Sequence, residues 1–238
     1  MKQIKYIMIL LFAFSCVEIF AQDGEWVTIR DFETWNSFNL KYKLNKNWKL
    51  GLEQQFRFND NSSALDRYFT ELSVSHSFSK YIFGGVGFRY LRQNDTKGDV
   101  QGFENHLRFN FDFGVKHSLN RFDFKYRLRF QTKNELGISK DEGDYSNNHI
   151  RLKAGVGYNI KKWKLDPEGS VEIFRHYEKG EQNGFNNIRF TFGTKYNLKK
   201  IGVFGLFYRF EKELNAQYPL SSHIIGFKYT YTLKKKKK

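Results

Sequence analysis

Hydrophobic and polar residues alternate along most of this sequence. In residues 122–131, aromatic or leucine side chains take the even positions, and charged or amide side chains take the odd ones. A repeat of two places alternate side chains on opposite faces of a β-strand. The alternation recurs in eleven segments between residues 35 and 233, and no stretch shows a sustained helical repeat. The pattern predicts an all-β protein.

The connections between these segments alternate in length. We expect short turns near residues 45–47, 79–80, 117–121, 161–162 and 199–200, and longer polar loops near 59–66, 93–102, 133–148, 176–184 and 212–220. The segments suit transmembrane strands, which need about 9–11 residues. Short periplasmic turns and long extracellular loops are typical of bacterial outer-membrane barrels. We therefore predict a transmembrane antiparallel up-and-down β-barrel over residues 22–233.

The expected number of strands is even, because an exported chain should begin and end in the periplasm. Eleven segments then imply a twelfth strand before Trp35, within residues 24–33, where the alternation is weak. We predict twelve strands, with ten as the alternative. Pro167 falls where a strand interior is expected, and proline cannot donate a ladder hydrogen bond. A bulge or a late strand start is therefore expected near Asp166 and Pro167.

The N-terminus has the features of a secretory signal. Lys2 and Lys5 precede an apolar run over residues 6–17, and Ala21 stands before Gln22. These are the basic region, apolar region and cleavage site of a signal peptide, and the run is too short to span a bilayer as a helix. We predict a signal peptide over residues 1–21 and the outer membrane of a Gram-negative cell as the destination. Barrel-assembly machinery is then a partner during biogenesis.

The single cysteine, Cys16, lies inside this signal. The residues before it are a poor lipidation motif. The mature chain is therefore expected to lack cysteine, which excludes disulfides and thiolate metal sites.

Composition leaves one question open, namely which face of the strands meets water. The formal net charge is +15, which suggests an anionic partner such as nucleic acid, anionic lipid or an acidic solute. A nucleic-acid binder usually exposes its aromatic side chains on one small sheet. Here every strand carries an apolar face, which is more apolar surface than a soluble monomer leaves exposed. We therefore predict membrane lipid and lipopolysaccharide as partners, and no nucleic acid.

Trp48 and Trp163 each follow a short turn and are expected to begin a strand. That depth matches the periplasmic aromatic girdle of outer-membrane barrels. Two ordinary buried tryptophans would not explain the shared position.

Residues 34–60 resemble the start of an uncharacterised family of bacterial outer-membrane barrels, domain of unknown function family 2490. In that family a Trp opens a strand, a Lys/Asn turn follows, and W-x-L-x-L-E-x-x-x-R-F comes next. The matching residues are Trp35, Asn45, Lys46, Asn47, Trp48, Leu50, Leu52, Glu53, Arg57 and Phe58. The resemblance continues as a pattern to Leu233. It implies a barrel and an outer-membrane location, but no activity and no catalytic residues.

The C-terminus departs from this resemblance. Outer-membrane barrels commonly end on an aromatic residue, whereas here Leu233 is followed by the lysines of residues 234–238. This is either a native basic tail in the periplasm or an end that is not native.

The inward face is predicted from residue parity and chain direction. Seven strands place an arginine in their outer half, and three glutamates lie at or near the same height: Arg57, Arg89, Arg108, Arg129, Arg151, Arg189, Arg209, Glu53, Glu71 and Glu211. Glu104 also borders this height. Inward positions below are small, namely Ser73, Ser75, Ser77, Gly85, Gly87, Gly114, Gly155, Gly157 and Gly193. We predict a charged lumen constriction above a roomier vestibule.

The constriction has two interpretations. Arginines and glutamates can pair and close a small structural barrel, because buried charges need partners. Alternatively, surplus arginine can form a narrow anion-attracting pore for small acidic solutes. The first interpretation is favoured, because a fold alone does not define a function.

Enzymatic and metal chemistry are not indicated. Of the six histidines, only His106 is predicted to point inward, and no Ser-His-acid set follows from the spacing. An outer-membrane lipid-active enzyme is therefore the least favoured alternative. Asp141, Glu142 and Asp144 suit a solvated loop better than a calcium site. We predict no enzyme activity, no cofactor and no metal.

Overall fold

A computed structural model describes residues 28–96, 101–139, 145–180 and 183–234. The predicted signal peptide and most of the C-terminal tail lie outside these residues. The described chain forms eleven strands: β1 (Ile29–Lys43), β2 (Trp48–Asn59), β3 (Ala64–Ser77), β4 (Ile82–Asp95), β5 (Gly102–Leu119), β6 (Phe122–Glu135), β7 (Asn147–Tyr158), β8 (Asp166–Tyr177), β9 (Gly184–Leu198), β10 (Gly202–Glu213) and β11 (Leu220–Lys234). Within the described part of the chain, no helix is long and apolar enough to cross a membrane.

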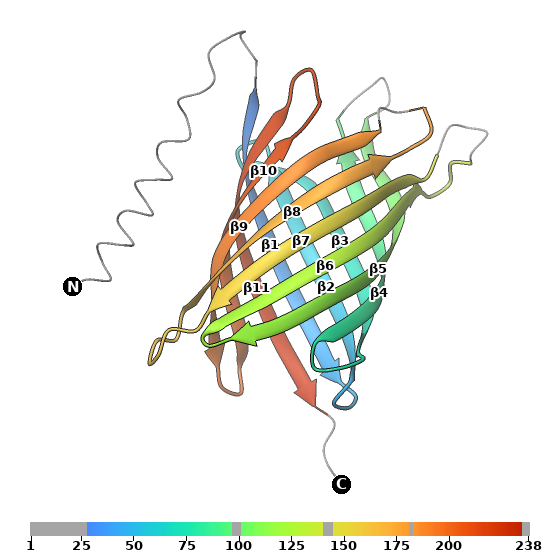
Figure 1. Ribbon diagram of the computed structural model, residues 1–238. Coiled ribbons are helices and arrows are strands. Elements are labelled where there is room, and N and C mark those ends of the chain that lie inside the picture. Colours follow the sequence, from blue (N-terminus) through green and yellow to red (C-terminus); the bar gives the residue numbers. More distant parts are fainter. Residues whose placement is uncertain (1–27, 97–100, 140–144, 181–182, 235–238) are drawn as a thin grey trace.

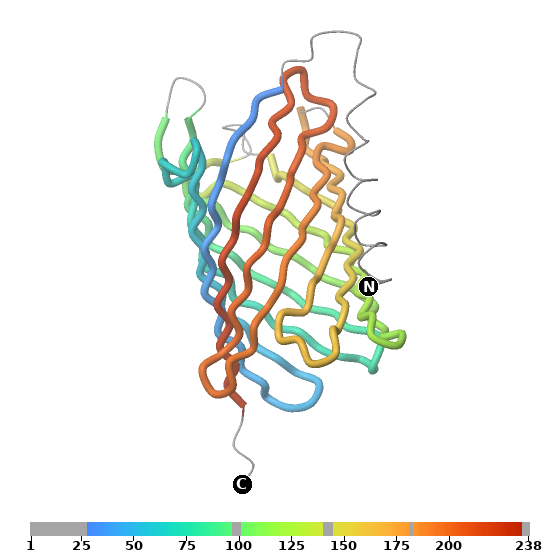
Figure 2. The backbone as a smooth tube through the Cα atoms, turned by 90° about the vertical axis from the view of Figure 1, so that its left-hand side faces the viewer, coloured from blue at the N-terminus to red at the C-terminus, as the bar shows by residue number. Residues whose placement is uncertain are grey.

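The strands form one closed barrel in which each strand pairs with its neighbour in sequence (Figure 1). These neighbouring pairs are antiparallel, whereas β1 and β11 close the barrel as a parallel pair from Ile29↔Leu220 to Lys43↔Lys234. Figure 2 shows the two strands side by side along the length of the barrel. The predicted all-β barrel is confirmed, and closure leaves no unpaired sheet edge.

The predicted twelfth strand is wrong, and so is the alternative of ten strands. Residues 29–34 form no separate strand because no turn precedes Trp35; they are the first part of β1. Residues 24–27 of the proposed segment lie outside the described residues. With strands that reverse at every connection, an odd number leaves the first and last strand pointing the same way. Parallel closure follows from that odd count. The first residue of β1 and the last residue of β11 therefore lie at opposite ends of the barrel (Figure 1).

The connections divide into two sets, one at each end of the barrel. We call the end with the β2–β3, β4–β5, β6–β7, β8–β9 and β10–β11 connections the long-loop end, and the opposite end the short-turn end. Contrary to the sequence prediction, the connections at the long-loop end are not all longer than those at the short-turn end. The β2–β3 connection is a tight turn over residues 60–63, in which Asp60, Asn61 and Ser62 all have positive φ. The β7–β8 connection is longer than the turn expected near residues 161–162, and β8 starts at Asp166, which confirms the late strand start expected near Pro167.

The barrel is apolar outside and polar inside. Large hydrophobic side chains are exposed on the outer face of the strands, including Phe38, Leu52, Leu72, Phe88, Phe109, Phe111, Phe113, Leu128, Phe130, Leu152, Phe192, Leu206 and Phe227. We call this surface the apolar band. Buried side chains are mostly polar or charged, such as Glu71, Arg89, Asn110, Arg151, Glu172 and Arg189. This distribution is the reverse of that in a soluble protein.

Candidate functional site

The ten residues predicted for the constriction line one cavity in the lumen. Its volume is about 500 Å³, and it lies on the long-loop side of the barrel interior. The lining also includes residues that the sequence prediction missed, namely Trp35, Arg67, Phe69, Arg127, Phe174 and Glu172. We call the arginines that line this cavity, with Glu71, Glu172 and Glu211, the arginine tier. The arginines are Arg57, Arg67, Arg89, Arg108, Arg127, Arg129, Arg151, Arg189 and Arg209.

Glu172 on β8 is the most connected carboxylate of the arginine tier. Its side chain is only 3% exposed and lies 2.7 Å from Arg127, 2.9 Å from Arg151 and 3.6 Å from Arg189. The three arginines come from β6, β7 and β9. One buried carboxylate therefore links β8 to three nearby strands of the barrel wall. Parity alone could have identified Glu172, since it lies between the outward-facing Val171 and Ile173.

Two further carboxylates extend the arginine tier around the barrel. Arg89 donates from Nε to Glu71 Oε2 at 2.7 Å, and Arg108 Nη2 lies 3.5 Å from the same oxygen. On the other side of Glu172, Nε of Arg189 donates to Glu211 Oε2 at 2.7 Å. Arg189 thus joins the Glu172 cluster to Glu211. Such pairing is what buried charges require.

Aromatic rings inside the lumen complete the arginine tier. The Arg57 guanidinium lies 3.6 Å from the centre of the Trp35 ring, and the Arg209 guanidinium lies 4.6 Å from it. Arg57 also donates to Gln55, and Arg209 donates to Thr191. Among the described residues neither guanidinium forms an ion pair with a carboxylate. Trp35 is 4% exposed and lies within β1, so the expectation that it opens a strand is wrong.

A second cavity of about 450 Å³ lies on the short-turn side of the arginine tier. Its lining includes the predicted small residues Gly155 and Gly157, the predicted Arg209, and five basic side chains that were not predicted at this height: Lys125, Arg127, Lys153, Lys195 and Lys228. Arg127, Lys153 and Arg209 line both cavities and therefore separate them.

Some glycines in the lower lumen make room for inward aromatic rings. A side chain on Gly114 would overlap the Phe83 ring, and one on Gly226 would overlap the Phe207 ring. The vestibule is therefore partly filled rather than empty.

Comparison with known proteins supports the resemblance noted above. A family model described as "Protein of unknown function (DUF2490)" matches residues 32–218, from the start of β1 to the connection before β11. The chain belongs to the DUF2490 family. Among curated proteins, none matches this chain. The family description assigns no activity, so the chemistry of this DUF2490 protein has to be argued from its own residues.

An ion pair joins β5 and β6, and the register of these two strands differs from the predicted one. The sequence predicts that Asp112 faces Lys125 or Arg127 across a turn over residues 117–121. Instead β5 continues to Leu119 and the turn is tighter, so Asp112 lies opposite Arg129. Arg129 donates two hydrogen bonds to Asp112, from Nε to Oδ1 at 2.6 Å and from Nη2 to Oδ2 at 2.7 Å.

Asp112→Ala is expected to destabilise the barrel by about 1.5–3 kcal/mol, the range for hydrogen bonds to charged groups. The substitution leaves the Arg129 guanidinium, 12% exposed, without its carboxylate partner. Asp141, which we expected to serve as the exposed comparison, lies outside the described residues. Asp123→Ala is the control, because Asp123 is exposed and bonds to Ser118 at the short-turn end. Denaturant unfolding in detergent measures both; equal midpoints would contradict the pairing.

The two predicted girdle tryptophans lie at the short-turn end. Trp48 begins β2 and packs on His76, with ring centres 4.3 Å apart. Trp163 is 59% exposed but lies in the β7–β8 connection, so the expectation that it begins a strand is wrong. The shared end of the barrel is consistent with a girdle, whose contact with lipid stays a prediction.

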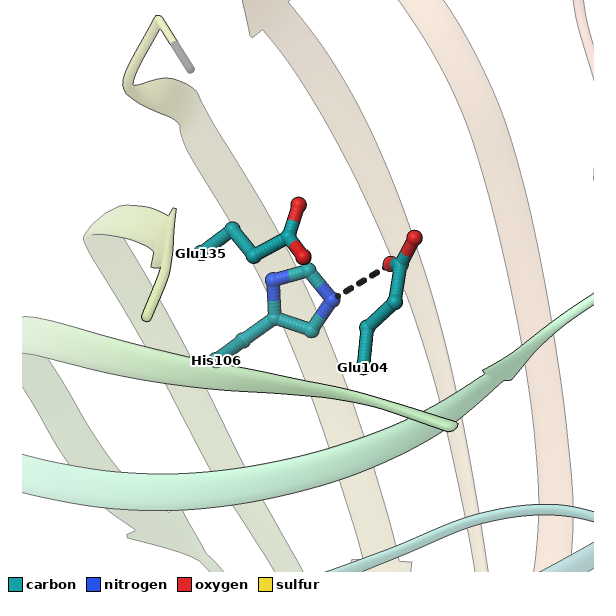
Figure 3. Close-up of side chains that lie close together, drawn as sticks. All are labelled: Glu104, His106 and Glu135. Atoms are coloured by element: carbon teal, nitrogen blue, oxygen red, sulfur yellow. Dashed lines mark hydrogen bonds and ion pairs between the residues drawn. The ribbon is translucent and has the colours of Figure 1, made fainter. Parts of the chain in front are cut away.

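A separate cluster of ionisable residues lies at the long-loop end of the lumen. Glu104, His106 and Glu135 bring their side chains together there (Figure 3). On the outer face, Arg92 lies opposite Asn105, and the exposed Phe103 follows towards the long-loop end.

Proposed function

We propose that this chain is an outer-membrane β-barrel whose lumen is closed by the arginine tier, with a structural rather than a catalytic role. The observation that carries the proposal is the combination of an apolar outer face with a charged, internally paired interior. An exposed apolar surface that encircles the barrel needs lipid to cover it. A closed sheet satisfies every strand edge, as a bilayer requires.

The proposed location follows from this surface and from the predicted signal peptide. The apolar band would lie in the hydrocarbon layer, and the long-loop end would face the outside of the cell. We expect the protein to fractionate with the outer membrane and to show heat-modifiable migration on gels. Recovery as a soluble periplasmic monomer without detergent would contradict the proposal.

Closure of the lumen is supported by the ion pairs of the arginine tier. Glu172 holds Arg127 in place, and Arg127 is one of the three residues between the two cavities. Free movement of solute past this height would require these paired side chains to separate. Purified protein in planar bilayers is therefore expected to show almost no steady conductance.

A narrow anion-attracting pore is the second candidate. It is favoured by the lower cavity, in which six basic side chains face only three acidic ones, Asp123, Asp166 and Glu168. Arg57 and Arg209 add guanidiniums without a carboxylate partner among the described residues. Positive rings of this kind attract small anionic solutes. Steady conductance of the unmodified protein with preference for chloride over potassium would establish this candidate in place of the closed barrel.

A further inference from the structure

The long-loop mouth of the barrel holds a set of donors that the arginine tier does not use. Glu104 and His106 project inward from β5, and Glu135 is the last residue of β6. His106 lies directly opposite Glu135 in the register, so both strands hold the set in place. His106 is 5% exposed, and its Nε2 lies 3.1 Å from Glu104 Oε2.

We propose that Glu104, His106 and Glu135 bind a divalent transition-metal ion of the zinc class. One ligand atom from each residue lies within 4.8 Å of the other two, and Figure 3 shows both carboxylates beside the imidazole ring. One imidazole with two carboxylates is a donor set that Zn²⁺ accepts. Calcium and magnesium prefer oxygen ligands alone, whereas imidazole favours zinc, copper, nickel or iron.

The charges around the site favour a cation. Glu104 and Glu135 bring two carboxylates to one imidazole, and one lysine, Lys133, also acts on Glu104. Asp95, the last residue of β4, adds a third carboxyl in contact with Glu104. Carboxylates this close repel one another, and a bound divalent cation converts that repulsion into attraction.

The strand next to the cluster carries a buried amide oxygen. Gln93 is directly opposite Glu104 in the register of β4 and β5. Its Oε1 is buried and has no hydrogen-bond partner among the described residues. Buried polar atoms are normally satisfied, so such an oxygen points to a missing ligand. Zinc usually takes four ligands, and Gln93 is on the same face of the sheet as Glu104.

The proposal is tested with zinc chloride alone, added to the full-length barrel in detergent after treatment with a chelator. We expect calorimetry to show one zinc ion per chain and the unfolding midpoint to rise with zinc concentration, because a ligand stabilises the state that binds it. His106→Gln and Glu135→Gln should each weaken binding at least tenfold. Cobalt(II) added to the unmodified protein should give the visible absorption of a bound, non-octahedral ion.

His176→Gln is the matched control. His176 also pairs with a glutamate through Nε2, at 3.0 Å from Glu178, and also lies near the long-loop end. Zinc binding should survive this change. Absence of binding by the unmodified barrel, or an equal loss in His176→Gln, would overturn the proposal. Glu135 ends its strand, so Glu135→Gln is expected to fold even if His106→Gln does not, and full zinc affinity in folded Glu135→Gln would also overturn it.

Discussion

Replacing Glu172 by glutamine is expected to destabilise the barrel by about 3–5 kcal/mol, the range for removing one partner of a buried ion pair. Glutamine keeps the size of the side chain but removes the charge that Arg127, Arg151 and Arg189 share. Three largely buried guanidiniums then repel one another without that carboxylate between them. Denaturant unfolding of the refolded barrel in detergent measures the change.

The same strand supplies the control. Glu168 on β8 pairs with Lys195 at 3.0 Å, but these side chains are 49% and 58% exposed. Exposed ion pairs contribute about 0–1 kcal/mol, so Glu168→Gln should change stability little. If the two variants unfold at the same denaturant concentration, Glu172 does not hold the arginine tier together. Glu172→Gln should also raise conductance in planar bilayers, with a preference for anions, because Arg127 loses its anchor between the two cavities.

Trp35→Ala is expected to produce a loss of similar size, about 3–5 kcal/mol for a large buried aromatic side chain. The indole is 4% exposed and supports the guanidiniums of Arg57 and Arg209, which have no carboxylate partner within the described chain. Removing the ring creates a cavity and takes away one aromatic partner of each guanidinium, so that Arg57 keeps only Phe69, at 5.5 Å, and Arg209 keeps Phe207, at 4.7 Å. Trp35→Phe keeps a ring and should recover part of the stability.

Trp163→Ala provides the comparison for the same residue type. Trp163 is 59% exposed in the β7–β8 connection and is expected to contribute far less to the unfolding free energy. Unfolding curves followed by circular dichroism avoid the loss of tryptophan signal in both variants. A larger effect at Trp163 than at Trp35 would contradict the account of the lumen.

The period-two alternation was enough to locate the strands and to assign their inward residues. The seven arginines were placed on one side of their strands because the alternation is nearly unbroken where they occur, as around Arg129. At β8 the alternation of Val171, Glu172 and Ile173 also places the central carboxylate inward, although the predicted constriction does not include it.

The way in which the barrel closes could not be predicted from the alternation of apolar and polar residues within each strand. Parity states which face a residue takes, but the partner of the first strand depends on the whole sheet. The expectation of an even count therefore created a strand from the residues that begin β1. The position of Trp35 within β1 was also not predicted. Its side chain faces the lumen, whereas the alternation assigns apolar residues to the outer face. The Glu104, His106 and Glu135 cluster depends on the register between β5 and β6, which a longer β5 sets.

The most direct test of the central claim is a nitroxide scan along β5 in lipid vesicles. Single cysteines from residue 109 to 115, introduced with Cys16 replaced by serine, report accessibility to oxygen and to a water-soluble nickel reagent. Phe109, Phe111, Phe113 and Val115 face outward, whereas Asn110, Asp112 and Gly114 face the lumen. The account predicts high oxygen accessibility and low nickel accessibility at the odd positions only. High nickel accessibility at Phe109, Phe111 and Phe113 would place the apolar band in water and contradict the membrane barrel.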